Sequence, residues 1–242
     1  VKPIKGVVLN SVGLTGPGAS ALLADGRWQQ RNDEPFFLSF MSVQPRADER
    51  LAELREFVAL LKRNLADFNA PVGLEMNFSC PNAGIDPSLL INEVGTALEI
   101  AADLNIPLQP KFNATVPIQA VCEVCGHSAC DAITMSNTIP WGQLTQQIDW
   151  RQLFGAAESP LAHIGGGGLS GWPLTPIICN WISAARDHGF SKPIWACGGI
   201  DSRRAVDQMR KAGASGVQLG VVAILRPWRM RRIIRYANAS FV

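Results

Sequence analysis

The sequence lacks the long apolar runs and the strong charge of one sign that mark two large classes of protein. No apolar stretch reaches the roughly 18 residues that a membrane-spanning helix requires, and no signal peptide opens the chain. Its 242 residues carry 22 Lys and Arg against 20 Asp and Glu, a formal net charge of +2. We therefore expect no membrane span and no nucleic-acid partner.

Two nucleotide-binding signatures are missing as well. No GxGxxG follows an early strand, so a Rossmann fingerprint is absent, and there is no P-loop. The chain shows no low-complexity tail and no internal repeat beyond an alternation of strands and helices. These absences exclude the commonest dinucleotide and nucleoside-triphosphate sites.

Cysteine is limited to six residues, mostly in apolar or motif contexts, which indicates reduced thiols and a cytoplasmic protein. One segment has cysteines and a histidine at a spacing that resembles a set of metal ligands, namely Cys122, Cys125, His127 and Cys130. A second cysteine pair is missing, so we interpret this segment as structural and predict no metal. An Arg-rich segment from Arg226 to residue 235 is interpreted as a solvated helix face, with a membrane or anion role as the lesser alternative.

Short β-like runs alternate with helical stretches along the chain. Residues 48–67, for example, carry apolar side chains at 51, 54, 57, 58, 60 and 61, which is helical spacing. Ser202 is predicted to be the N-cap of a later helix. The predicted strands are 36–43, 72–80, 107–112, 131–136, 194–197 and 216–219, and the predicted helices are 48–67, 86–104, 116–125, 173–188, 202–212 and 225–237.

This alternation predicts an α/β protein with a parallel sheet, and two architectures fit it. An open, doubly wound sheet accommodates six units directly. A closed (β/α)8 TIM barrel needs eight, so it requires that the first two strands are missing from this chain. We favour the barrel, as a single domain over residues 1–242 that is incomplete at its N-terminus.

The run from Val72 to Cys80 turns from apolar to polar at its end, where α/β barrels keep their chemistry. A thiol between Asn77 and Asn82 could act as a base beside amides that recognise a planar, amide-like substrate. The alternative is a buried cysteine that packs as a small hydrophobe.

Other strand ends carry polar groups too. Lys111 lies inside an apolar strand, either as a cation that stabilises a bound anionic group or as an edge residue in water. Asn10 and Asn137 join Asn77 and Asn82 as a possible quartet for a pyrimidine-like ring, although any one of them is commoner as a turn residue. Glycines close the last strands, at 171, 198–199 and 220, which favours a phosphate site.

With these residues in place, the chain resembles the dihydroorotate dehydrogenase family, in its class 1, cysteine-dependent branch. Cys80 supports this branch, because the quinone-linked branch has serine at the base position. The resemblance implies an FMN-binding TIM barrel whose first two strands precede Val1. The matching stretches are residues 10–14, 77–82, Lys111, 136–138, 167–171, 197–200 and 219–220.

The resemblance also implies roles. Cys80 resembles the base that takes a proton from C5 of dihydroorotate while hydride passes from C6 to N5 of FMN, giving orotate in pyrimidine biosynthesis. Lys111 resembles the lysine that stabilises the reduced flavin. The implied substrate set is Asn10, Gly13, Leu14, Asn77, Asn82, Asn137 and Thr138, and the implied FMN phosphate cradle is Gly171, Gly198, Gly199, Gly220 and Val221.

Two alternatives stay open at this point. One is another dihydropyrimidine dehydrogenase-like flavoenzyme, and the other is a non-redox barrel that binds a phosphorylated ligand. Within the family, a homodimer is the usual assembly, and an iron–sulfur electron-transfer subunit is a possible partner. The electron acceptor, whether fumarate, NAD through a partner or another molecule, is left undetermined by the sequence.

Overall fold

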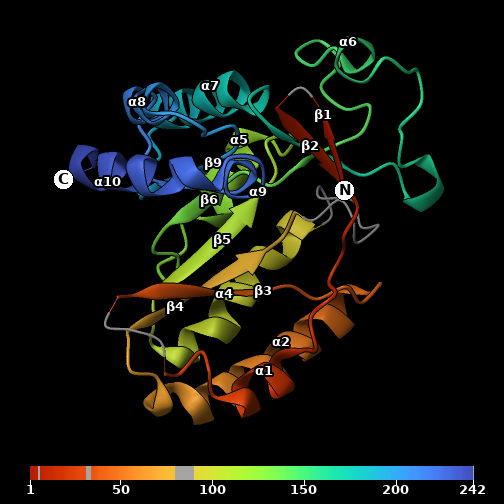
Figure 1. The fold of residues 1–242 in the computed structure, drawn as a ribbon. Helices are drawn as coiled ribbons and strands as arrows, with labels where there is room; N and C mark the ends of the chain where they lie inside the picture. The colour runs from red at the N-terminus through yellow and green to blue at the C-terminus, as the bar shows by residue number, and fades with distance from the viewer. Residues whose placement is uncertain (5, 31–33, 80–89, 242) are drawn as a thin grey trace.

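A computed structural model describes residues 1–4, 6–30, 34–79 and 90–241 of the chain. Its centre is a six-stranded parallel sheet, curled into a partial barrel (Figure 1). The strands lie in the order of the sequence from one edge to the other, and they are β3 (Phe36–Phe40), β4 (Val72–Asn77), β5 (Leu108–Phe112), β6 (Ile133–Met135), β9 (Ile194–Cys197) and β10 (Gly216–Gln218).

This strand order decides between the two predicted architectures. A doubly wound sheet reverses its order at a switch point, whereas a barrel adds each new strand to the same side of the last. Every neighbouring pair in this sheet is parallel, and no reversal occurs. The prediction of a partial TIM barrel is confirmed, as are all six predicted strands.

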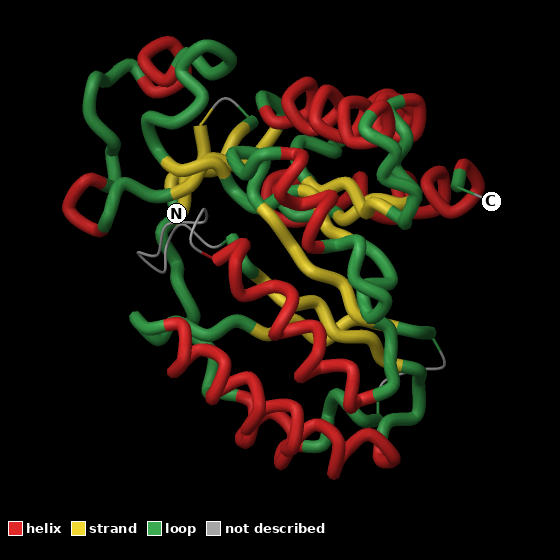
Figure 2. Tube along the Cα trace, turned by 180° about the vertical axis from the view of Figure 1, so that it is seen from behind, coloured by secondary structure: helices red, strands yellow, loops and turns green. Residues whose placement is uncertain are grey.

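Helices pack against the sheet in two groups (Figures 1 and 2). One group accompanies β3 and β4, and the other accompanies β9 and β10. The first consists of α1 (Ala19–Asp25), α2 (Ala47–Asn64) and α4 (Val94–Ala101). The second consists of α7 (Leu174–Asp187), α8 (Arg203–Lys211) and α10 (Met230–Ser240), with α5 (Ile118–Val124) beside α7.

A second sheet, which the sequence did not predict, joins the start of the chain to a distant segment. It is antiparallel, with the order β1 (Lys2–Ile4), β2 (Val7–Asn10), β8 (Gly168–Gly171) and β7 (Ile139–Pro140). Half of β8 is glycine, which has low strand propensity, and its partner β2 lies far away in the sequence. Local pattern therefore carries no signal for this pairing.

The predicted helix over residues 225–237 is wrong in its start. The chain instead forms a short helix α9 (Val221–Leu225), a 3₁₀ turn η6 (Pro227–Arg229) and then α10. Pro227 lacks a backbone N–H and cannot continue α9, so the break falls at this residue. The N-cap prediction is confirmed, because Ser202 Oγ accepts a hydrogen bond from Ala205 N at 3.3 Å.

Short elements complete the chain. The 3₁₀ turns η1 (Leu65–Asp67), η3 (Ile91–Glu93) and η4 (Ala102–Leu104) flank α2 and α4, while α6 (Trp150–Phe154) and η5 (Ala162–Ile164) lie between β7 and β8. In the part of the chain that the structure describes, no helix is both long and apolar enough to cross a bilayer.

Candidate functional site

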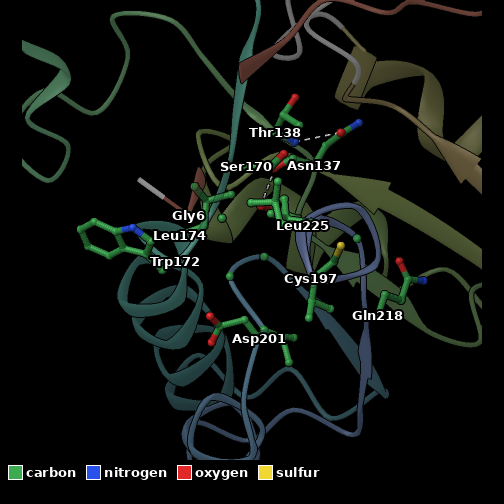
Figure 3. A pocket seen from close by; sticks show the side chains of 18 of the residues that line it. Gly6, Asn137, Thr138, Ser170, Trp172, Leu174, Cys197, Asp201, Gln218 and Leu225 are labelled. Atoms are coloured by element: carbon green, nitrogen blue, oxygen red, sulfur yellow. Dashed lines mark hydrogen bonds between the residues drawn. The ribbon is translucent and has the colours of Figure 1, made fainter. Parts of the chain in front are cut away.

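A cleft lies at the carboxyl ends of the parallel strands. Its volume is about 680 Å³, counting the part that opens to solvent. Strands β5, β6, β9 and β10 and the turns that follow them contribute its walls, together with β8 (Figure 3). Its lining residues include Lys111, Asn137, Thr138, Ser170, Gly171, Cys197, Gly198, Gly199, Asp201, Gln218, Gly220, Val221 and Arg226.

Lys111 reaches the cleft from the end of β5, and a buried carboxylate on the neighbouring strand holds it. Its Nζ lies 3.1 Å from Oε1 of Glu75, whose side chain is 6% exposed, against 19% for Lys111. Ser39 Oγ donates to the same oxygen at 3.1 Å. Thr134 Oγ1 and Gln218 Nε2 each donate to Oε2 at 3.0 Å. Each carboxylate oxygen of Glu75 thus accepts two hydrogen bonds.

This network keeps Glu75 charged. Burial alone raises the pKa of Glu75, but the Lys111 ammonium and the hydrogen bonds from Gln218 and Thr134 outweigh burial, so the pKa lies below its ordinary value. The carboxylate in turn fixes a cation at the wall of the cleft. The pair is therefore positioned before any ligand arrives.

Two asparagines meet at the ends of β4 and β6. Asn137 Nδ2 donates to Asn77 Oδ1 at 3.2 Å and to Ser79 Oγ at 3.3 Å. Asn77 Oδ1 also accepts from Ser79 N and Ser79 Oγ, each at 3.1 Å. Asn137 Oδ1 accepts from Thr138 N at 2.8 Å. The two amides therefore lock one another, and they present a fixed pattern of donors and acceptors next to Lys111.

Glycines form the floor of the cleft for two different reasons. Gly199 has φ +72°, and a Cβ there would lie 2.8 Å from Gly171 O, so the close approach of two strand-end turns requires glycine. Gly220, the N-cap residue of α9, has no atom within 4 Å of an added Cβ. Its surroundings are open, which leaves room for a ligand beside the first N–H groups of α9.

Two further groups line the cleft without having been predicted. Cys197 ends β9, and burial raises the pKa of its thiol. Asp201, in the turn after β9, accepts a hydrogen bond from Arg226 Nη1 at 2.8 Å. The Cys197 thiol is neutral, so the charges in the lining are two cations, Lys111 and Arg226, each paired with a carboxylate.

The structure places the predicted site residues in three groups. Lys111, Asn137 and Thr138 line the cleft, as do all five residues of the predicted phosphate cradle. Asn77 contacts Asn137 but is not a lining residue. Asn10 ends β2 opposite Gly168, and Gly13 and Leu14 follow it in an exposed loop; none of the three lines the cleft. Cys80 and Asn82 lie outside the described residues.

Sequence reasoning missed Glu75, Thr134 and Gln218, which hold Lys111 in place. A signal was present for Glu75, because a carboxylate inside the apolar run of β4 requires a buried partner. Thr134 and Gln218 carried no such signal. In the described ranges, no group of three or more His, Cys, Asp or Glu side chains could hold a metal ion.

The cleft fits the FMN that the sequence resemblance implies. A cation, Lys111, faces it from one wall. Glycine turns at the ends of β9 and β10 face it from another, with open space beside Gly220 for a phosphate.

Comparisons with known proteins agree with this geometry. A sequence profile of the dihydroorotate dehydrogenase family matches residues 1–239. The chain is 29% identical to the catalytic subunit of dihydroorotate dehydrogenase B (NAD+) from Anoxybacillus flavithermus, over 94% of this chain and 68% of that protein. It is also 29% identical to dihydroorotate dehydrogenase A (fumarate) from Lactiplantibacillus plantarum, over 93% of this chain and 70% of that protein.

A solved structure shares the fold. The ligand-free dihydroorotate dehydrogenase of Eimeria tenella superposes with a TM-score of 0.68 at 17% identity, covering 99% of this chain and 72% of that one. The strand order, the cleft and the match over residues 1–239 lead to one conclusion. The chain belongs to the dihydroorotate dehydrogenase family, in its class 1 branch.

Proposed function

We propose that this protein oxidises dihydroorotate to orotate, with FMN bound in the cleft at the carboxyl ends of the strands. The observation that carries the proposal is the fixed cation of Lys111, which faces the glycine turns of β9 and β10 across one cleft in a member of this family. FMN, when bound, supplies the redox chemistry by accepting the hydride of the substrate.

Residues of this chain would hold the cofactor at two ends. Gly171, Gly198, Gly199, Gly220 and Val221 line the part of the cleft where backbone N–H groups suit a phosphate. Lys111 offers positive charge at the far wall, where its ammonium favours negative charge on a bound ring. Because Glu75 accepts two hydrogen bonds at each oxygen, the position of Lys111 does not depend on the ligand.

The substrate would bind against the amides. Asn77 and Asn137 are fixed by their mutual hydrogen bond, and Thr138 follows on the same loop. Amides present one donor group and one acceptor, which matches the alternating C=O and N–H of a dihydropyrimidine ring. The predicted substrate set also includes Asn10, Gly13, Leu14 and Asn82, which stay predictions from the resemblance.

Cys80 is the proposed base. A thiol with an ordinary pKa of about 8.5 acts as a base at neutral pH once positive potential lowers that value. In the sequence it directly follows Ser79, three residues after Asn77, at which β4 ends. It would take the proton from C5 of the substrate.

Anaerobic titration tests the activity. The protein, saturated with FMN and mixed with dihydroorotate, should lose its flavin absorbance in proportion to substrate and release orotate. A protein that binds FMN but keeps its absorbance with dihydroorotate, and loses it with another dihydropyrimidine, would reassign the substrate. A colourless protein that takes up no FMN would favour the non-redox barrel.

Substitution of Cys80 tests the base. In Cys80→Ser, reduction of the flavin should slow by about 100-fold or more at neutral pH, within the range expected for loss of a general base, and by less at high pH. The reason is that an alcohol is a weaker base than a thiolate. Cys179→Ser, at a half-buried cysteine on α7, is the matched control and should keep the rate. Equal rates and equal pH profiles for the wild type and Cys80→Ser would show that Cys80 is not the base.

The oligomeric state and the electron acceptor are two further parts of the proposed function. Relatives named for NAD+ and for fumarate are equally similar to this chain, at 29% identity, so the acceptor does not follow from similarity. One of them is named a catalytic subunit, which supports a partner subunit, and the iron–sulfur nature of such a partner stays a prediction from the resemblance. We propose a cytoplasmic homodimer as the basic unit. Light scattering tests the dimer, and turnover with fumarate or NAD+ identifies the acceptor.

A further inference from the structure

A second cavity lies between the start of α8 and the start of α10, two helices that pack side by side (Figure 1). Its volume is about 650 Å³, counting the part open to solvent. Arginine dominates its lining. The residues that form it are Asp201, Ser202, Arg203, Arg204, Arg229, Arg232 and Ile233.

The charge in this arginine cavity is unbalanced. Asp201 is its one carboxylate, and Arg226, which lies outside the cavity, already pairs with it at 2.8 Å. Arg203 lies over the ring of Tyr236, 5.1 Å from the centroid. Within the described ranges, the other three arginines have no ion pair or hydrogen bond through their side chains; these are Arg204, Arg229 and Arg232.

Both helices place these cations where helix electrostatics disfavours them. Arg203 and Arg204 occupy the first turn of α8, while Arg229 is the N-cap residue of α10 and Arg232 lies in the first turn of that helix. Neither first turn contains an acidic residue. A cation near a helix N-terminus is unfavourable, whereas an anion there is stabilised. An anion between these two ends would therefore interact favourably with both helix starts and with the arginines.

The frame around the cavity is held in place without the arginines. Ile233 and Ala237 of α10 are buried against the core, and Tyr236 Oη donates to Asp207 Oδ1 of α8 at 2.8 Å. The N-cap bond of Ser202 fixes the start of α8. The arginine side chains are exposed, so their guanidinium groups can move to meet a ligand while the two helix starts stay fixed.

We propose that the arginine cavity binds a small molecule that carries a diphosphate group. Guanidinium groups bind phosphate oxygens through paired, charge-assisted hydrogen bonds. One phosphate engages one or two such forks, whereas four arginines and two helix starts suit two linked phosphates with a higher charge. The cavity adjoins the FMN cleft, with which it shares Asp201, but none of its four arginines lines that cleft. The proposal does not rest on the activity proposed above.

Isothermal titration of the FMN-saturated protein with sodium pyrophosphate tests the proposal. Pyrophosphate should bind the wild type about tenfold more tightly than inorganic phosphate at equal ionic strength, because it engages more guanidinium groups. The double variant Arg229→Gln/Arg232→Gln should bind pyrophosphate about tenfold or more weakly. The matched control is Arg55→Gln/Arg63→Gln, which removes two exposed arginines from α2 and should change binding by less than about twofold.

Each other outcome overturns the proposal in a defined way. An equal loss in the control would show a general charge effect. Unchanged binding in Arg229→Gln/Arg232→Gln would place the anion elsewhere. Absence of pyrophosphate binding, together with arginine-dependent sedimentation on phosphatidylglycerol vesicles, would replace the small ligand by a membrane surface. Misfolding is checked by thermal melting, and the double variant should melt no lower than the wild type because it loses no ion pair.

Discussion

Replacement of Glu75 by Gln removes the charge that holds Lys111, and the structure sets the expected cost. The carboxylate is 6% exposed and accepts four hydrogen bonds, so Gln cannot satisfy all of its donors. Loss of one partner from a buried ion pair costs roughly 3–5 kcal/mol. Lys111 keeps 19% exposure and therefore some hydration, so we expect about 3 kcal/mol, at the low end of that range.

Urea unfolding measures this cost directly. For a chain of this length, about 3 kcal/mol corresponds to a melting temperature lower by roughly 6–12 °C. The matched control is Asp103→Asn, which breaks the exposed Lys62–Asp103 pair, with side chains 52% and 62% exposed, and should cost less than about 1 kcal/mol. The double variant Glu75→Gln/Lys111→Met should be less destabilised than the sum of its single variants, because both charges leave together.

The pH dependence gives an independent check. The pKa of Glu75 is lower in the folded protein than its ordinary value of 4.5, so the folded state binds this proton more weakly than the unfolded state. Its stabilising contribution is therefore present above that ordinary value and is lost as pH falls through the folded pKa. The gap between wild type and Glu75→Gln should shrink on acidification. A gap of less than about 0.5 kcal/mol at neutral pH, or one that acid leaves unchanged, would refute the reasoning.

Three further predictions follow from individual contacts. Lys111→Met should weaken FMN binding by about tenfold or more, measured by fluorescence quenching on titration, and unchanged binding would contradict its place in the site. Gly199→Ala should lower the free energy of unfolding by about 2 kcal/mol or more, because its Cβ would lie 2.8 Å from a backbone oxygen at φ +72°. Gly220→Ala, where an added Cβ meets no atom within 4 Å, should lower it by under about 1 kcal/mol. Equal melting temperatures for the two variants would refute the predicted difference. Arg50→Met should cost about 3–5 kcal/mol in urea unfolding, because it leaves Glu93 buried without its ion-pair partner, and a cost under about 1 kcal/mol would show the pair to be solvated.

The sequence alone determined the strands and the chemistry at their ends. Alternation of apolar runs with helical spacing predicts six βα units, and each predicted strand is present. The polar ends of these strands, including Lys111 and Asn137, were recognisable from the sequence. An ammonium or an amide at the end of an apolar strand costs free energy when it is buried, unless it has a hydrogen-bonding or charged partner. Local periodicity and side-chain chemistry carry this information, because both can be identified within a short segment of consecutive residues.

Only the tertiary structure decided which side chains meet. The strand order showed a barrel and not a doubly wound sheet. The sheet also brings Lys111, Thr134 and Gln218, from three different strands, within hydrogen-bond distance of Glu75 on a fourth. It also paired β2 with β8 across a long stretch of sequence and set the arginines of α8 against those of α10. Such contacts depend on the register and packing of distant segments, and no periodicity within one segment encodes the partner that it will find in another.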